Sequence, residues 1–324
     1  MRHDLRMSSA QRWLRANSFH HAEFPAERIA ARRKQRVSVC LPARDEERTI
    51  GSIVASLMPL VDRGTIDQVV VVDDSSDGTG EIAARLGAEV YRQSDLLPEL
   101  GPVQGKGDAM WRSLSVLDGE ILCFLDADSD NFSEHFACGL IGPLVEHERL
   151  SLVKGFYRRP FRQAGVTLPE GGGRVTELTA RPLLNLFYPD LAGVRQPLAG
   201  EFAVRRELIE RLPFLTGYGV DIALLIDAYR DSGLDAIGQV DLDTRQNDHQ
   251  QLTDLGAMAF AVLRAVVSRL EMDGRVGEVG PATFLAANGT GFAPVELGHI
   301  ERPPFAGVAA NQADLGDSAG GHSA

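Results

Sequence analysis

The chain has 324 residues, of which 44% are hydrophobic, so it can bury one substantial core, or one core and a smaller appendage. Its net charge of −12 argues against a general nucleic-acid binder. No run approaches the roughly 18 apolar residues of a membrane span, and the N-terminal stretch MRHDLRMSSAQRWLRANSF has no apolar signal core. The three cysteines follow no disulfide or metal spacing, which predicts a protein of the reducing cytoplasm.

The first 36 residues are basic although the whole chain is acidic. They contain nine Lys or Arg residues and three acidic residues, Asp4, Glu23 and Glu27, a local excess of six positive charges. Such a segment could contact an anionic partner, but a solvated, flexible segment is the favoured interpretation. We therefore treat residues 1–36 as a separate basic arm.

From residue 37 onward, short apolar runs alternate with helical patterns. The runs predict buried strands, and the segments between them repeat apolar residues at helical spacing. In chain order we expect strands at residues 37–41, 69–72, 89–91, 121–125 and 152–156, and helices at residues 49–60, 79–86 and 108–117. Strands that alternate with helices form crossover units. The predicted fold class is therefore α/β, with a largely parallel sheet and helices on both faces.

The sequence changes character after about residue 165. A Gly-rich loop at residues 168–178 leads into a helix that reaches Leu186. Further on we expect a helix at residues 220–231, a strand at 236–240 and a long amphipathic helix at 252–270. The remaining residues, 273–324, are rich in Gly, Ala and Pro, and we expect the final GDSAGGHSA to be disordered.

Three polar clusters directly follow predicted strands. They are PARDEE (42–47), DDSSDG (73–78) and DADSD (126–130). Ligands bind at the carboxyl ends of the strands in such sheets, so a single mouth is expected to collect all three clusters. Taken alone, the first two are equally compatible with ordinary turns that cap the next helix.

The third cluster places Asp126, Asp128 and Asp130 close together, where their charges repel one another. A solvated loop is one explanation. The other is a divalent cation, because oxygen ligands hold such ions and the ion cancels the repulsion. Asp126 and Asp128 are two residues apart and would face the same side of an extended backbone. One could then bind a ribose while the other takes a metal that also holds a diphosphate.

A short GKG segment (105–107) precedes the predicted helix at residues 108–117. Its glycines let the backbone approach a phosphate, the helix N-terminus offers free N–H groups, and Lys106 supplies a positive charge. The segment lacks the longer spacing of a P-loop, so it gives little support to an ATPase.

Taken in order, VCLPARDEE, VVDDSSDGT, GKG and FLDAD resemble the nucleotide-sugar half of the GT-A glycosyltransferases, whose Asp-x-Asp motif binds the divalent metal. The later motifs GFYRRPF, GGGRVTEL, RPLLNLFYPDLAGVRQPLAGEFAVRREL and PFLTGYGVDIALLID are similar to the actinobacterial glucosyl-3-phosphoglycerate synthases. The mannosyl-3-phosphoglycerate synthases share this family. The resemblance covers about residues 37–270, most of the chain.

The resemblance implies a GT-A (Rossmann-like) fold, with a mixed, largely parallel sheet flanked by helices and a smaller C-terminal acceptor-binding subdomain. It divides the chain into a nucleotide-sugar half (37–165), an acceptor-binding half (166–272) and a tail (273–324), after the basic arm (1–36). The implied activity is that of a hexosyltransferase: retaining transfer of glucose from UDP-glucose to the 2-hydroxyl of 3-phosphoglycerate, with Mg²⁺, for which Mn²⁺ can substitute. The resemblance implies that no covalent nucleophile takes part and that the mechanism is front-face attack, with the leaving diphosphate taking the acceptor's proton. The family is generally dimeric, so we expect a homodimer.

Carried over by position, the resemblance also assigns roles to single residues. The uridine would be cradled by Pro42, Ala43, Arg44, Glu46 and Asp73. Lys106 would lie beside the donor, Asp126 and Ala127 beside the ribose and diphosphate, and Asp128 would bind the metal. The acceptor's phosphate and carboxylate would be held by Gly173, Arg174, Val175 and Thr176. Asp221 would lie near the sugar and the Leu198 backbone under the anomeric carbon; with Lys106 and Asp128, they are the expected catalytic residues.

The family carries Arg-x-His after its last strand, and this chain departs from that pattern. Arg245 is followed by Gln246 and Asn247, and the histidine comes at His249. The histidine of the motif is expected to help bind the metal, so we assign His249 to the metal and Asn247 to the acceptor site, with Asn247 as an alternative oxygen ligand. Two anionic substrates also require a local basic patch, for which the candidates are Arg158, Arg159, Arg174, Arg181 and Arg245.

Other functions remain open at this point. The nearest is a mannosyl-3-phosphoglycerate synthase or a donor-promiscuous enzyme that uses GDP-mannose or GDP-glucose. A nucleotidyltransferase would also use paired aspartates, but it would place a Gly/Lys-rich triphosphate loop where this chain has PARDEE. A non-catalytic nucleotide-binding module is opposed by the intact DAD and GKG. A dehydrogenase is opposed because no GxGxxG follows the first strand.

Overall fold

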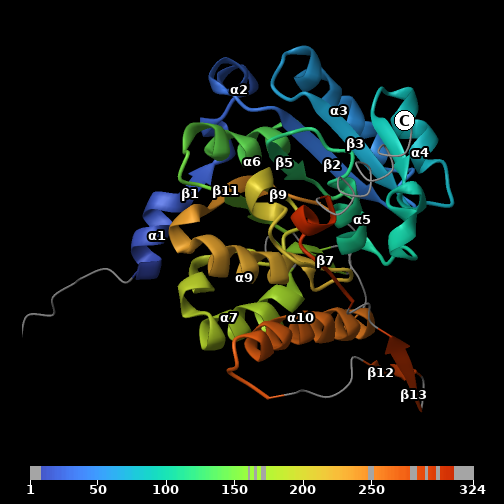
Figure 1. Cartoon of the computed structure of the whole chain (residues 1–324), viewed down its shortest axis with the longest axis vertical. Helices are drawn as coiled ribbons and strands as arrows, with labels where there is room; N and C mark the ends of the chain where they lie inside the picture. The colour runs from blue at the N-terminus through green and yellow to red at the C-terminus, as the bar shows by residue number, and fades with distance from the viewer. Residues whose placement is uncertain are drawn as a thin grey trace, which may run out of the picture.

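The computed structural model describes residues 9–159, 161–163, 166–168, 173–246, 252–277, 283–288, 291–296 and 300–309. Its centre is an eight-stranded sheet with the strand order β1–β11–β6–β9–β5–β2–β3–β4 (Figure 1). In that order the strands are Ser18–His20, Ile237–Thr244, Leu152–Arg158, Phe202–Arg205, Ile121–Phe124, Val37–Ala43, Gln68–Asp73 and Glu89–Arg92. Neighbouring strands are parallel except for β9, which runs antiparallel to both β5 and β6. The predicted mixed, largely parallel sheet is confirmed.

Helices cover both faces of this sheet. The α-helices are α1 (Ser9–Asn17), α2 (Ala26–Arg32), α3 (Ile50–Asp62), α4 (Thr79–Arg85), α5 (Lys106–Ser113), α6 (His135–Glu146), α7 (Arg181–Phe187), α8 (Arg206–Ile209), α9 (Val220–Ser232) and α10 (Leu252–Met272). Shorter helical turns are η1 (His21–Glu23), η2 (Gln93–Asp95), η3 (Pro98–Leu100), the π-helical η4 (Thr176–Ala180), η5 (Pro189–Gly193) and η6 (Leu234–Ala236). Small two-stranded sheets pair β7 (Phe161–Gln163) with β8 (Val166–Leu168), β10 (Phe214–Leu215) with β14 (Glu301–Arg302), and β12 (Thr283–Asn288) with β13 (Gly291–Glu296).

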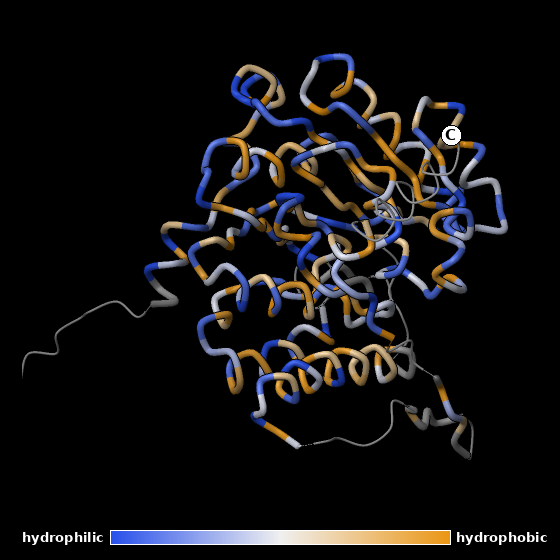
Figure 2. Tube along the Cα trace, in the orientation of Figure 1, coloured by the Kyte–Doolittle hydropathy of each residue, from blue (hydrophilic) through white to orange (hydrophobic). Residues whose placement is uncertain are grey.

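The sheet separates two hydrophobic cores, and strand alternation explains why. In β3, Val70 and Val72 belong to the core shared with α5, α9 and α10, whereas Val69 and Val71 belong to the core shared with α2, α3 and α6. Successive side chains of a strand point to opposite faces, so an all-apolar strand feeds both cores. Figure 2 shows the hydrophobic residues gathered along these central strands, with hydrophilic residues in many of the loops around them.

The expected strands and helices are all present, with ends that differ by a few residues. The sequence analysis missed α6 and β9. In α6 every residue from Phe136 to Leu144 is buried, and the helix contains Pro143, so it has neither a polar face nor an uninterrupted helical pattern. The strand β9 belongs to the second half of the chain but lies between β5 and β6 of the first, so the two halves share one sheet.

The expectation of a solvated N-terminal arm is wrong for the described residues 9–36. The strand β1 pairs in parallel with β11 and extends the sheet. Trp13 is only 3% exposed, and its Nε1 donates to the carbonyl oxygen of Ile237 at 2.8 Å; Asn17 Nδ2 donates to the same oxygen at 2.7 Å. A buried tryptophan and backbone pairing hold this segment in place despite its charge.

The C-terminal segment 300–309 is also part of the fold. Thr216 N donates to the carbonyl oxygen of Ile300 at 3.1 Å, and Trp111 Nε1 donates to that of Pro303 at 2.9 Å. Arg302 Nε contacts Asp108 Oδ1 at 2.7 Å, while Arg112 Nε donates to the other carboxylate oxygen of Asp108 at 2.9 Å. These contacts fasten the segment to α5. The expected disorder of residues 316–324 lies outside the described residues.

No helix in the described part of the chain has the length and apolar character that a membrane span requires.

Replacing Arg302 by Met should destabilise the fold, because it removes one of the two guanidinium partners of the fully buried Asp108. We expect a loss of about 3 kcal/mol in the free energy of unfolding, measured by urea denaturation. Arg211→Met is the matched control, because Arg211 pairs with Asp231 at the surface and should contribute less than about 1 kcal/mol. Equal losses in the two variants would contradict a structural role for the Arg302–Asp108 pair.

Candidate active site

The three predicted polar clusters meet at one edge of the sheet. Ala43 of β2 pairs in register with Asp73 of β3, and Cys40 of β2 pairs with Phe124 of β5, so these parallel strands end together. Thr49 Oγ1 donates to the carbonyl oxygen of Ala127 at 2.6 Å and joins the start of α3 to the DADSD loop. The prediction of a common mouth is therefore confirmed by the strand register.

The residues predicted to cradle a uridine lie at the ends of strands β2 and β3 and in the loop that follows β2. The loops after these two strands are linked by hydrogen bonds from Asp45 N to Ser75 Oγ at 2.8 Å and from Glu46 N to Thr79 Oγ1 at 2.9 Å. Asp73 is buried, and its Oδ1 accepts from Ser75 N at 3.1 Å. Pro42 and Glu46 are half-buried, Ala43 is buried, and Arg44 is exposed. The predicted residues therefore lie together on one side of the mouth. If the two clusters were only turns that cap the next helix, they would not need to lie together.

Lys106 begins α5 and points into the same mouth. Its Nζ lies 2.5 Å from Asp126 Oδ1 and 3.9 Å from Asp221 Oδ2. Burial opposes its charge, but Asp126 and Asp221 outweigh that effect and raise the pKa of Lys106, so its amine stays protonated. The sequence analysis expected Gly107 to admit a phosphate. The structure gives it a packing role, because a Cβ there would overlap the carbonyl oxygen of Leu215.

Asp126 is held on both carboxylate oxygens. Lys106 Nζ forms an ion pair with Oδ1, and Arg245 Nη1 forms one with Oδ2 at 3.0 Å. Burial would raise the pKa of Asp126, but the two cations outweigh it and lower the pKa. Arg245 Nη2 also contacts Asp128. Gly200 makes room for this arrangement, since a Cβ there would collide with both Lys106 Nζ and the Asp126 carboxylate.

Behind Arg245 lie two residues that the sequence analysis did not identify. Glu201 Oε1 is 2.5 Å from Arg245 Nη1, and the Tyr157 hydroxyl donates to Glu201 Oε2 at 2.7 Å. Burial raises the pKa of Tyr157 to about 12, an effect that Arg159 and Arg245 partly offset. The quoted motifs GFYRRPF and QPLAGEF contain both residues, but a single tyrosine or glutamate within an apolar segment forms no recognisable metal or catalytic pattern.

Asp221 and Lys154 form a second buried group. Asp221 lies in the first turn of α9, with its Oδ1 4.0 Å from Lys154 Nζ, and in the described part of the chain this oxygen accepts no hydrogen bond. Lys154 Nζ instead donates to the carbonyl oxygen of Ala199 at 2.5 Å, directly after Leu198. Burial raises the pKa of Asp221, an effect that Lys106 and Lys154 partly offset. A buried carboxylate oxygen without a donor is suited to accept a hydroxyl group of a ligand.

The predicted acceptor residues lie at the start of the helical segment that contains η4 and α7. Gly173 adopts a φ of +73°, and Glu177 N donates to its carbonyl oxygen at 3.0 Å. Arg174 and Val175 follow in helical conformation, and Thr176 is buried. Within the described residues, Gly173 in the left-handed region therefore does lead into a helix, as predicted, while the ligand of these residues remains a prediction.

Asn247 and His249 lie outside the described residues. The point from which they leave is defined: Asp130 N donates to the carbonyl oxygen of Gln246 at 3.0 Å, and Gln246 N donates to Asn131 Oδ1 at 2.8 Å. Asn131 Nδ2 also donates to the carbonyl oxygen of Thr244 at 2.7 Å. The end of β11 is thus bound to the DADSD loop.

The carboxylates of the mouth fit a divalent cation by their chemistry. Burial first, and then repulsion from Asp128, raise the pKa of Glu46, so the two carboxyl groups lie close to one another. Asp126 is occupied by two cationic side chains, whereas Asp128 has a 43% exposed side chain. Hard oxygen donors suit Mg²⁺ and Mn²⁺, so Asp128 is the carboxylate best placed to hold the predicted metal.

Another group of possible metal ligands lies elsewhere. Within the described residues, His20, His21 and Asp243 bring one ligand atom each within 4.8 Å of the others. However, His20 Nδ1 accepts from Ala22 N at 3.2 Å, so in the neutral ring Nε2 carries the proton, and His21 Nε2 is hydrogen-bonded to Asp243 at 2.7 Å. These contacts are those of a hydrogen-bonded junction between β1 and β11.

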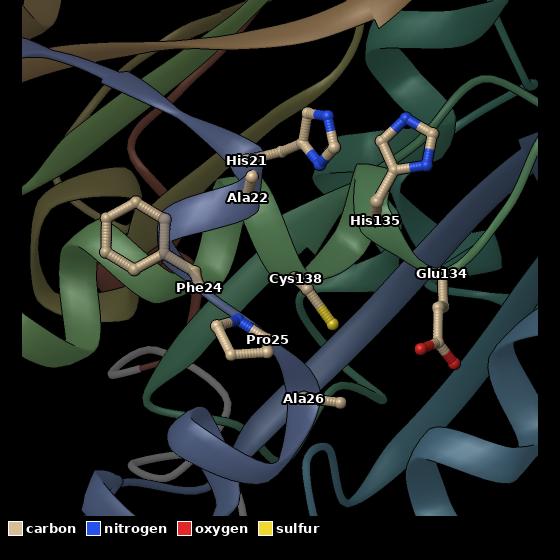
Figure 3. A pocket seen from close by; sticks show the side chains of 8 residues that line it. All are labelled: His21, Ala22, Phe24, Pro25, Ala26, Glu134, His135 and Cys138. Carbon is tan, nitrogen blue, oxygen red and sulfur yellow. The ribbon is translucent and has the colours of Figure 1, made fainter.

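A nearby cavity of about 130 Å³ lies between the N-terminal segment and α6. Figure 3 shows the imidazole rings of His21 and His135 close together at one end and Cys138 below them. Sites for drug-sized ligands typically occupy about 300–1,000 Å³. The cavity is therefore too small for a nucleotide sugar, and it is lined by residues outside the three polar clusters.

Three comparisons agree with this geometry. The model of the glycosyl transferase family 2 matches residues 38–172. The glucosyl-3-phosphoglycerate synthase of Petrotoga mobilis is 42% identical over 301 residues, which cover 89% of this chain and 93% of that protein. The structure of mannosyl-3-phosphoglycerate synthase from Rubrobacter xylanophilus matches with a TM-score of 0.84 and 44% identity, over 93% of this chain and 98% of that one. Glucosyl-3-phosphoglycerate synthase from Mycobacterium tuberculosis, in complex with Mn²⁺, UDP-glucose and phosphoglyceric acid, matches with a TM-score of 0.81 and 40% identity, over 90% and 98%.

The raised pKa of Asp221 predicts how stability changes with pH. A carboxyl with a raised folded-state pKa favours folding below its unfolded pKa, and this contribution is lost as the pH rises through the folded pKa. Asp221→Asn, which cannot ionise, should therefore have a higher Tm than the wild type near neutral pH. This advantage should shrink as the pH falls toward the unfolded value of about 3.9; thermal unfolding at several pH values measures it.

Asp231→Asn on the same helix is the matched control. Hydrogen bonds from Arg211 and Ser232 lower the pKa of Asp231, so its stabilising contribution is present above the unfolded pKa and lost in acid. The control should lower the Tm near neutral pH and approach the wild type in acid. A Tm difference of the same sign in both variants would contradict the assignment.

Proposed function

The chain belongs to the glucosyl-3-phosphoglycerate synthase family, and we propose that it is a retaining hexosyltransferase that moves glucose from UDP-glucose to the 2-hydroxyl of 3-phosphoglycerate. The observation that carries this proposal is the pairing of Asp126 with Lys106 and Arg245 at the strand end beside Asp73 and Asp128. The arrangement joins a nucleoside-binding rim to a cationic site for a diphosphate. It comes from three segments far apart in the sequence.

On the donor side, Pro42, Ala43, Arg44, Glu46 and Asp73 bind the uridine, and Asp126 and Ala127 bind the ribose and diphosphate. Lys106 lies close to Asp126 and keeps its proton, so it stabilises negative charge that develops on the leaving diphosphate. Asp221 supplies a buried carboxylate oxygen for a sugar hydroxyl. The acceptor hydroxyl then attacks the anomeric carbon of glucose from the face that the diphosphate leaves. A bond forms between the acceptor oxygen and this carbon, the bond to the diphosphate oxygen breaks, and the diphosphate takes the proton of the hydroxyl.

Asp128 would hold Mg²⁺ or Mn²⁺, with His249 or Asn247 as a further ligand from the segment that leaves the end of β11. The bound cation supplies Lewis-acid stabilisation of the diphosphate. Residues of the chain hold the metal-binding groups in place. Arg245 contacts Asp128, and Asp130 and Asn131 are hydrogen-bonded to the residues between Thr244 and Gln246, directly before the predicted ligands.

On the acceptor side, Gly173, Arg174, Val175 and Thr176 would bind the phosphate and carboxylate of 3-phosphoglycerate. The support is Gly173, which adopts a left-handed conformation at the start of a helical segment, together with the Arg174 guanidinium, which can bind an anion through two N–H groups. Asn247 belongs to the same proposed site, and Leu198 lies one residue before the carbonyl that Lys154 binds.

We also propose a homodimer, because Leu178 and Leu186 expose apolar side chains along η4 and α7. A cytoplasmic location is proposed because Cys40, Cys123 and Cys138 are buried and unpaired. The division into a donor half (37–165) and an acceptor half (166–272) remains part of the proposal.

A mannosyl-3-phosphoglycerate synthase is the second candidate. The match to the structure of that enzyme from Rubrobacter xylanophilus, at 44% identity, favours it.

Product formation from 3-phosphoglycerate with Mg²⁺ distinguishes the two candidates when UDP-glucose, GDP-glucose and GDP-mannose are tested side by side. We expect UDP-glucose to give a kcat/KM about tenfold or more above the GDP sugars, roughly the discrimination that one or two extra polar contacts provide. Preference for GDP-mannose would establish the second candidate. No turnover with any donor, with nucleotide binding intact, would contradict the proposed acceptor.

Arg174→Ala should weaken acceptor binding much more than donor binding, because it removes the guanidinium of the proposed phosphate site. We expect the KM for 3-phosphoglycerate to rise about tenfold or more, as for loss of a charged hydrogen-bond partner, and the KM for UDP-glucose to stay within about threefold. Steady-state kinetics measure both values. Arg211→Ala is the control, since Arg211 pairs with Asp231 at the surface and is not a candidate for the substrate-binding basic patch, so both KM values should stay unchanged. The reverse pattern of KM changes in Arg174→Ala would place Arg174 outside the acceptor site.

A further inference from the structure

Arg245 is a buried cation held between two pairs of acidic or polar groups. Its side chain is only 1% exposed. The guanidinium contacts Asp126 at 3.0 Å and also Asp128. It also contacts Glu201 at 2.5 Å and donates to the Tyr157 hydroxyl oxygen at 2.9 Å. The guanidinium therefore already neutralises the carboxylates to which we assign the ribose, diphosphate and metal.

Glu201 and Tyr157 fix the position of this guanidinium. Glu201 is 2% exposed, and its second oxygen accepts from the Tyr157 hydroxyl at 2.7 Å. The same hydroxyl accepts from Arg159 Nη2 at 2.7 Å, and the Tyr157 ring lies 5.5 Å from the Arg245 guanidinium carbon. Every polar atom of Tyr157 and Glu201 named here is engaged, so the guanidinium has one defined place.

Basic and acidic side chains are matched in the site before any ligand is bound. The basic side chains are Lys106, Lys154, Arg159 and Arg245, and the acidic side chains that lie around them are Asp126, Asp128, Glu201 and Asp221. The half-buried carboxyl of Glu46 also lies near Asp128. A divalent cation alone would leave an excess of positive charge among buried groups, which is costly. A divalent cation that arrives with a diphosphate would leave the balance almost unchanged.

We propose that Arg245, held by Glu201 and Tyr157, is a built-in counter-cation of Asp126 and Asp128 that makes divalent-cation binding conditional on a nucleoside diphosphate. This rests on the proposed function, because it takes the donor site to lie at these aspartates. Glu201 and Tyr157 are positioning residues that act through Arg245. By thermodynamic reciprocity, the cation must strengthen nucleotide binding by the same factor by which the nucleotide strengthens cation binding.

The test is calorimetric titration of the full chain with Mn²⁺, with and without saturating UDP. Two variants are compared with the wild type. Glu201→Gln removes the anion behind Arg245 and leaves more of its positive charge directed at Asp126 and Asp128. The double variant Arg245→Met, Glu201→Gln removes both charges, leaves no buried glutamate without a partner, and frees the two aspartates.

Without UDP, we expect the double variant to bind Mn²⁺ about tenfold more tightly than the wild type, and Glu201→Gln to bind it about threefold more weakly, within the usual range of coupling between sites. The tightening of Mn²⁺ binding by UDP should be about fivefold larger in the wild type than in the double variant. The matched control is Arg211→Met, Asp231→Asn, which removes an Arg–Asp pair from the surface outside the three polar clusters and should leave both affinities unchanged.

Equal Mn²⁺ affinities for the wild type and the double variant without UDP would overturn the proposal, as would wild-type Mn²⁺ binding that is independent of UDP. If the double variant does not fold, the test rests on Glu201→Gln. Mn²⁺ binding by this variant that is unchanged or tighter than in the wild type would then overturn the proposal. None of these measurements uses 3-phosphoglycerate or turnover. If the Mn²⁺ affinities follow the expected order but the enzyme makes no product, the role of Arg245 as a counter-cation is supported and the proposed acceptor reaction is contradicted.

Discussion

The site depends on the Asp126 carboxylate, which takes Lys106 on one oxygen and Arg245 on the other. A buried carboxylate is unstable without partners, and these two cations make its charged form favourable. They come from the start of α5 and the end of β11, so the single carboxylate ties two distant segments to the strand β5. Gly200 has no side chain for the same reason, because a Cβ would occupy the space in which the Lys106–Asp126 pair lies.

Both ends of the chain support these two cations. At one end, β1 pairs with β11, and Trp13 and Asn17 donate to the carbonyl oxygen of Ile237, the first residue of the strand that leads to Arg245. At the other, Arg302 and Pro303 fasten residues 300–309 to Asp108 and Trp111 of α5, the helix that begins with Lys106. The sequence analysis treated both ends as appendages. The structure makes them the outer supports of the elements that carry the site.

Residues with their own local pattern were predictable. The aspartates at 126 and 128, Lys106 between glycines, and the acidic turns after β2 and β3 follow apolar strands directly, and that placement is visible in one sequence. Glu201, Tyr157 and Lys154 were not predictable in this way. Each is a single polar residue inside a buried segment, and its function becomes visible only when β9 lies between β5 and β6. The helix α6 was missed because burial on all sides leaves no polar face. The roles of Asn247 and His249 stay predictions, because both residues lie outside the described part of the chain.

The sequence by itself determined the alternation of strands and helices, the chemical character of each strand end, and the family resemblance that sets the substrate class. Each of these is a local property, because apolar periodicity and short motifs depend on neighbours along the chain. The tertiary structure decided which charges share a site. Asp126 and Arg245 are 119 residues apart, and Glu201 reaches Arg245 because β9 is inserted antiparallel between β5 and β6. Ionic contacts of this kind depend on distance in space, so they could not be deduced from spacing along the chain.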